Sequence, residues 1–121
     1  MRILILILAA CAFVVTSPTC VDLSKITKND IDNSHFVGKI EVIESRKENH
    51  YTVYKVKFKR FYHSRVNVLV LRWLLHETYY VRQDCPSLQK GEDYIACCTS
   101  VYRCEKARPY DNLTLEEWRL L

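Results

Sequence analysis

The N-terminus of this sequence constrains the fold most strongly, because it predicts the compartment in which the chain folds. Met1 and Arg2 form a short positive start, residues 3–15 are an uncharged apolar run of 13 residues, and residues 16–19 are small and polar. This layout is typical of a secretory signal peptide, and the run is shorter than the roughly 20 residues that cross a membrane as a helix. We therefore expect a signal peptide over residues 1–19, a mature domain over residues 20–121, and a secreted, extracellular protein with no membrane span.

The cysteines beyond the signal segment are expected to be oxidised in that compartment. They are Cys20, Cys85, Cys97, Cys98 and Cys104. Because disulfides persist in secreted proteins, most should be bridged, and the odd number leaves one thiol free or paired between chains. Cys97 and Cys98 are adjacent, so on a strand they would point to opposite faces and need not share a partner. A zinc site is disfavoured, because no C-x₂-C pair occurs.

Size and composition predict one globular domain. The chain has 121 residues, of which 49% are hydrophobic and 26% charged, with two glycines and three prolines. This composition excludes disordered, collagen-like and low-complexity chains. The net charge of +4 is too small to argue for a nucleic-acid partner or a membrane surface.

Alternating hydrophobicity predicts a mainly β fold. Strands are expected over residues 36–43, 51–61, 66–75, 78–81 and 93–99, with residues 100–103 as a turn or hairpin partner and residues 21–35 as a polar loop. Several short strands in a chain of this size suggest a small closed or partly open barrel.

Residues 51–61 give the clearest strand signal, because their apolar and basic side chains alternate strictly. Lys55, Lys57 and Lys59 share one face of this strand. The favoured interpretation is a solvated strand face, and the alternative is a contact with acidic glycans such as glycosaminoglycans.

The C-terminus predicts a helix with a well-formed start. Thr114 is the expected N-cap, and Glu117 three residues later completes a capping box. Leu113 before the cap can pack against Trp118 as a hydrophobic staple. Asn112 begins a glycosylation sequon with Leu113 and Thr114, so it is a candidate modification site.

No motif of a known catalytic site occurs in the sequence. Zinc-protease, serine-hydrolase, P-loop and dinucleotide-binding signatures are all absent. The histidines lie far apart in sequence, at His35, His50, His63 and His76. Cysteines in disulfides are poor nucleophiles, since nucleophilic attack needs a thiolate. We therefore expect no enzyme and no cofactor of the protein's own.

Motifs of a known module cover residues 85–121. Cys85-Pro86-Ser87-Leu88 precedes a turn and strand at residues 90–96 (KGEDYIA), and four residues separate Cys104 from residues 109–114 (PYDNLT). This arrangement resembles the second half of the netrin-like module in tissue inhibitors of metalloproteinases, and residues 36–40 (FVGKI) also suit that family. The resemblance implies a five-stranded OB-fold-like (netrin-like) barrel with a C-terminal helix, linked by disulfides.

The resemblance also implies inhibition of secreted or matrix zinc metalloproteases through the mature N-terminus. In that family the first residue, here Cys20, binds the catalytic zinc of the protease through its free α-amine and its carbonyl oxygen. A catalytic zinc keeps one position open for water, which these two atoms can displace. The amine must be neutral to bind, and its reference pKa of about 8 makes this attainable next to a cation. The zinc is therefore shared with the target protease.

Further residues are implied at the same contact. Val21 is expected in the specificity pocket of the protease, followed in the contact segment by Asp22 and Leu23. A Cys20–Cys85 bridge is also implied, and closing so long a loop is worth on the order of 4 kcal/mol in the chain-entropy model. This bridge would hold Cys20 against the three residues that precede Cys85. The two segments would then form a rigid wedge that loses little conformational entropy on binding. Those three residues are Arg82, Gln83 and Asp84.

One departure from the family affects the bridges. Inhibitors of this family begin Cys-x-Cys, whereas the third mature residue here is Asp22. The bridge from this position to Cys104 cannot form, so Cys104 is expected to pair with Cys97 or Cys98 across a short turn. The alternative function is a non-inhibitory netrin-like module that binds an extracellular protein or glycan.

Overall fold

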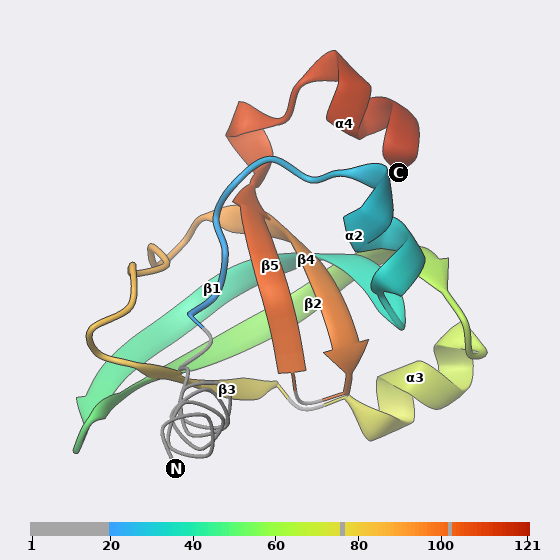
Figure 1. Cartoon of the computed structure of the whole chain (residues 1–121). Coiled ribbons are helices and arrows are strands. Elements are labelled where there is room, and N and C mark those ends of the chain that lie inside the picture. The colour runs from blue at the N-terminus through green and yellow to red at the C-terminus, as the bar shows by residue number, and fades with distance from the viewer. Residues whose placement is uncertain (1–19, 76, 102) are drawn as a thin grey trace, which may run out of the picture.

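A computed structural model of the chain describes residues 20–75, 77–101 and 103–121 (Figure 1). The predicted signal peptide and His76 lie outside these described residues. Within them, five strands form one antiparallel sheet in the order β3-β2-β1-β4-β5. The strands are β1 (Phe36–Glu48), β2 (Tyr51–Ser64), β3 (Thr78–Arg82), β4 (Asp93–Ser100) and β5 (Arg103–Pro109).

The sheet curls into a partly open barrel, with β4 and β5 lying across β1 and β2 (Figure 1). Irregularities in the pairing of β1 with β2 fall between Val37 and Gly38 and at two later points, and such bulges bend a strand. Gly38 is needed at this bend, because an added Cβ would lie 3.0 Å from the backbone oxygen of Arg60. The mainly β, disulfide-linked fold with a C-terminal helix is therefore confirmed.

Two hydrophobic clusters cover the two faces of the sheet. Inside the curl, Phe36, Ala96 and Cys98 are fully buried, together with side chains from β2 and β5. On the other face, Val37 and Cys97 are buried. This alternation confirms that Cys97 and Cys98 point to opposite faces. Cys98 is bonded to Cys104, whereas the thiol of Cys97 is free and burial raises its pKa to about 11.

The helices are α2 (Lys28–Asn33), α3 (Val68–Leu74) and α4 (Leu115–Leu120), with a 3₁₀ turn η1 (Tyr110–Asn112) before α4. The capping box of Thr114 and Glu117 is present at the start of α4, as predicted. Residues 21–35 were expected to be a loop, but Thr27 and Asp30 form a second capping box that starts α2.

The predicted strand over residues 66–75 is wrong, because this segment contains helix α3. A short apolar run does not distinguish a buried strand from a helix by periodicity alone. The side chain of Asn67 caps the helix by accepting a hydrogen bond from the backbone N–H of Leu69. Leu71 is fully buried, whereas Trp73, two residues on, is 89% exposed. The helix therefore anchors through one residue and leaves most of its apolar side chains outside.

Substitutions in α3 test this orientation. Leu71→Ala is expected to lower the free energy of unfolding by about 2–3 kcal/mol, because it removes fully buried methyl groups. Trp73→Ala should change it by less than about 0.5 kcal/mol, since surface substitutions rarely do more. Urea denaturation of both variants checks the prediction, and a larger loss for Trp73→Ala would contradict it.

Candidate functional site

The candidate site is the N-terminal segment, residues 20–24, which lies against the barrel at its open side. Cys20 is exposed and forms a disulfide with Cys85, with a Cα–Cα distance of 5.3 Å. The bridge joins the first described residue to the loop that follows β3. The structure thus brings Cys20 beside residues 82–84, which were assigned to the same contact.

That loop is itself fixed to the turn between β1 and β2. The backbone N–H of Gln83 donates to the carbonyl of His50, and its side-chain amide donates to the carbonyl of Asn49 at 2.8 Å. Arg82 and Asp84 form an exposed ion pair at 3.0 Å. The disulfide therefore anchors Cys20 to a hydrogen-bonded loop.

Asp22 holds the segment to the edge strand β5. Its backbone N–H donates to the carbonyl of Glu105 at 2.8 Å, and its carbonyl accepts from the N–H of Ala107 at 3.0 Å. These bonds form a parallel β-bridge opposite Lys106. The backbone of Asp22 thus fixes the segment to β5 at a point two residues from Cys104.

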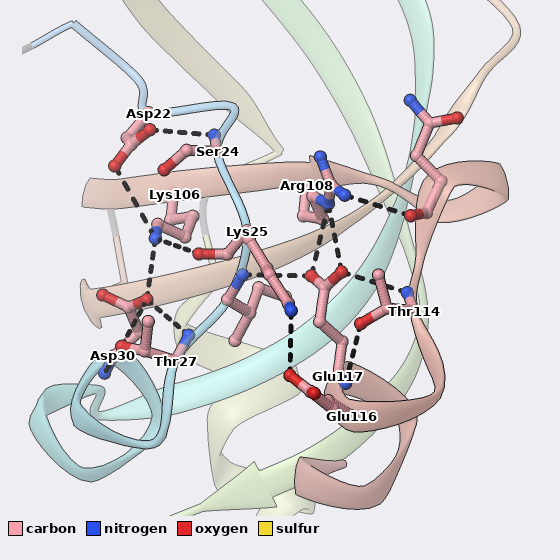
Figure 2. Close-up of polar contacts among 12 residues, drawn as sticks. Asp22, Ser24, Lys25, Thr27, Asp30, Lys106, Arg108, Thr114, Glu116 and Glu117 are labelled. Carbon is pink, nitrogen blue, oxygen red and sulfur yellow. Dashed lines mark hydrogen bonds and ion pairs between the residues drawn. The ribbon is translucent and has the colours of Figure 1, made fainter.

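The ionised carboxylate of Asp22 is stabilised by a hydrogen-bond donor and a nearby cation (Figure 2). It accepts the backbone N–H of Ser24 at 2.8 Å and lies 3.6 Å from the ammonium of Lys106. Hydrogen bonds from Ser24, with the charge of Lys106, hold the pKa of Asp22 below its usual value. Lys106 also contacts Asp30 at 2.7 Å and donates to the carbonyl of Lys25. This cation therefore ties the segment to the start of α2.

The side chains of the segment alternate between the core and solvent. Val21 and Leu23 are half-buried against the cluster inside the curl, whereas Cys20 and Asp22 are exposed. In this arrangement the side chain of Val21 packs on its own barrel. Its predicted insertion into a protease pocket would require it to leave this position.

The row of Lys55, Lys57 and Lys59 lies beside carboxylates. Lys59 pairs with Asp93 at 2.9 Å and with Glu41 at 3.2 Å. In the register of β1 and β2, Lys57 is opposite Glu41 and Lys55 is opposite Glu44. The row is thus a face of mixed charge, which weakens the argument for an acidic glycan.

The other candidate residues are distributed over the surface. Asn112 is exposed in η1, so its side chain is accessible for glycosylation. The ring nitrogen of His63 lies 2.7 Å from the carbonyl of Leu120. Among residues 20–75, 77–101 and 103–121, no group of three or more metal-ligating side chains comes together. Within the same ranges, no helix is long and apolar enough to cross a membrane.

Two buried charges were missed in the sequence. Lys106 is 7% exposed and Glu117 is fully buried. Each organises contacts between residues about 80 or 90 positions apart, namely Lys106 with Lys25 and Glu117 with Ile26. The capping box at Glu117 was a local signal, but it does not reveal the contact with Ile26.

Comparisons with known proteins agree with this fold. A family model described as "AceES-2: Excretory-secretory protein 2" matches residues 18–121. The chain is similar in fold to the crystal structure of Ancylostoma ceylanicum excretory-secretory protein 2, with a TM-score of 0.60 and 22% sequence identity. The match covers 84% of this chain and 98% of that one. No curated protein matches the sequence.

Proposed function

Because the chain belongs to the excretory-secretory protein 2 family, which implies a secreted protein, we propose that it inhibits zinc metalloendopeptidases outside the cell. The narrower likeness to tissue inhibitors of metalloproteinases is part of this proposal. The observation that carries it is the fixed position of Cys20, which is exposed and joined to Cys85. Once the signal peptide is removed, the α-amine and the carbonyl of this residue form a two-atom ligand for a protease's zinc.

The anchoring of the segment supports this role energetically. The disulfide to Cys85 and the backbone bridge of Asp22 to β5 hold the segment at two points. A ligand that is already ordered loses little conformational entropy on binding. Leu23 and residues 82–84 flank Cys20 and would extend the contact. With Val21 packed inward, we expect the zinc contact to dominate the affinity.

Blocking the amine tests the proposal most directly. A mature protein that begins at Cys20 is expected to inhibit a matrix-type metalloprotease, whereas the same protein with one alanine before Cys20 should lose measurable inhibition. The extra residue converts the amine into an amide, which cannot bind zinc as a neutral amine does. Hydrolysis of a fluorogenic peptide by the protease is the measurement.

The control is to show that the two proteins are folded alike: they should have the same circular dichroism spectrum and the same unfolding midpoint. Equal inhibition by both forms would refute chelation through the amine. No inhibition by the form that begins at Cys20, at a large molar excess over the protease, would remove the function altogether.

The second candidate is a non-inhibitory binding module, and helix α3 favours a protein ligand over a glycan. Four apolar side chains of this helix are at least half exposed, namely Leu69 at 71%, Val70 at 50%, Trp73 at 89% and Leu74 at 56%. Surface helices normally present polar residues to water, so an apolar outer face indicates a contact surface. Glycans offer little apolar area to cover it.

Site-specific photocrosslinking discriminates this candidate. A photoreactive residue at position 73 should crosslink to one defined protein in the fluid into which the chain is secreted. The same label in place of Trp118, the other tryptophan of the chain, is the control. If position 73 gives no more product than position 118, the candidate is abandoned.

A further inference from the structure

A cavity of about 250 Å³ lies inside the curl of the sheet, on the side where β3 and β5 do not meet. Among the five strands of the described residues, β3 pairs only with β2 and β5 pairs only with β4, so the barrel is open between β3 and β5. The N-terminal segment runs along β5 at this opening (Figure 1). Cys20 and Val21 form part of the cavity wall.

The floor of the cavity is apolar and belongs to the core. Ile40, Tyr54 and Val56 contribute to it from β1 and β2, and each is at most 4% exposed. Ala96 from β4 and Ala107 from β5 complete the floor. The space exists because these two inward positions carry a methyl group where larger residues would fill it.

Most polar groups around the cavity have partners among the described residues; the exception is one buried carboxylate oxygen of Glu105, which accepts no hydrogen bond. The hydroxyl of Tyr79 donates to the carbonyl of Val101 at 3.3 Å, and that of Tyr54 accepts from the N–H of Leu88 at 3.1 Å. Arg103 and Glu105 lie at the rim and form an ion pair at 3.0 Å. Burial raises the pKa of Tyr79 strongly. The interior therefore offers apolar contact rather than sites for a charged or strongly polar ligand.

We propose that this cavity binds a small, uncharged, apolar molecule of one to two fused rings. The size follows from known cavities: an apolar cavity of about 150 Å³ binds benzene, whereas drug-sized ligands occupy about 300–1,000 Å³. The cavity lies between these limits. Mouths of β-barrels are common ligand sites, and apolar lining with few polar groups is their usual composition.

Ligand binding in the cavity does not depend on protease inhibition, but the cavity and the proposed inhibitory segment share the residue Val21. Val21 lines the cavity and is half-buried against the core. A ligand that occupies the cavity adds contacts to the folded state that the unfolded chain lacks. It therefore raises the unfolding midpoint, and the stabilisation grows with the logarithm of the ligand concentration once this exceeds the Kd.

Titration with 1-naphthylamine, an uncharged fluorophore of two fused rings whose emission strengthens in apolar surroundings, tests the proposal on the mature protein. We expect a saturable rise in fluorescence with one site per chain and displacement of the probe by naphthalene. Ala107→Leu fills the cavity from β5 and Val56→Phe fills it from β2, so each should weaken probe binding at least tenfold. Ile95→Leu is the matched control, because Ile95 is buried in the cluster on the other face of the sheet.

The result that overturns the proposal is a wild-type protein that gives no saturable signal, or filled variants that bind as well as wild type. Circular dichroism establishes whether each variant is folded. If both filled variants unfold, nuclear Overhauser contacts decide the question in the wild-type protein. Contacts between naphthalene and the methyl groups of Val56 and Ala107 support the cavity, and their absence refutes it.

Discussion

Removal of the Cys20–Cys85 disulfide is expected to lower the free energy of unfolding by about 4 kcal/mol. The two cysteines are 65 positions apart, so the bridge removes much loop entropy from the unfolded chain. The double variant Cys20→Ala/Cys85→Ala avoids a free thiol, and urea denaturation with the wild type alongside gives the difference. The variant should also inhibit a protease far more weakly than wild type, because its first residue is no longer anchored to the loop that follows β3.

The second disulfide is the internal control for this prediction. Cys98 and Cys104 are only 6 positions apart, so the same chain-entropy model gives about 2 kcal/mol for Cys98→Ala/Cys104→Ala. The order of the two losses therefore tests whether loop closure dominates. If the Cys20/Cys85 variant lost less free energy of unfolding than the Cys98/Cys104 variant, loop closure would not dominate, and local packing around each disulfide would be the main source of stabilisation.

The sequence predicted the fold well wherever one face of a strand is buried. Tyr54 and Val56 alternate with lysines on β2, and both are buried as expected. The prediction failed at α3, because Leu69, Val70 and Trp73 are apolar although they face outward. Hydrophobic patterning assumes that apolar side chains are inside, so it cannot identify a helix whose outer face is apolar.

The position of Cys20 in the candidate site was predicted, but the contacts of Asp22 were not, because these contacts join residues far apart in the sequence. The resemblance to a known module placed Cys20 beside residues 82–84, and the structure joins these segments through Cys85. It gave no account of how Asp22 would be held. The backbone pairing of Asp22 with β5 and the ion pair of its carboxylate with Lys106 both link positions more than 80 residues apart. A single sequence carries no local signal for such contacts.

Glu117→Ala is expected to lower the free energy of unfolding by about 3–5 kcal/mol, because it removes the centre of a buried polar network. Glu117 is fully buried in α4 and lies 3.2 Å from the guanidinium of Arg108. Its carboxylate also accepts the backbone N–H groups of Ile26 and Thr114, both at 3.0 Å (Figure 2). The substitution leaves those donors without partners, and an unpaired buried donor is destabilising.

The pH dependence identifies the charge of Glu117 as the cause. Burial alone would raise the pKa of Glu117, but the N–H groups of Ile26 and Thr114, with the charge of Arg108, lower it overall from the usual 4.5. A carboxyl group with a lowered pKa stabilises the fold above its unfolded-state pKa, and this stabilisation is lost as the pH falls through its folded-state pKa. The difference between wild type and Glu117→Ala should therefore be constant above about pH 5 and shrink in stronger acid.

Glu116 provides the matched control, because it is the neighbouring glutamate in α4 but is exposed. Its side chain is 78% exposed and pairs with Lys25 at 2.9 Å. Exposed ion pairs contribute little to stability, so Glu116→Ala should leave the unfolding curve close to that of wild type at every pH. Equal losses at the two positions would show that α4 is stabilised by its general acidity at the helix start. A loss confined to Glu117 shows instead that the C-terminal helix is attached to the backbone of Ile26, just after the N-terminal segment, through one buried carboxylate.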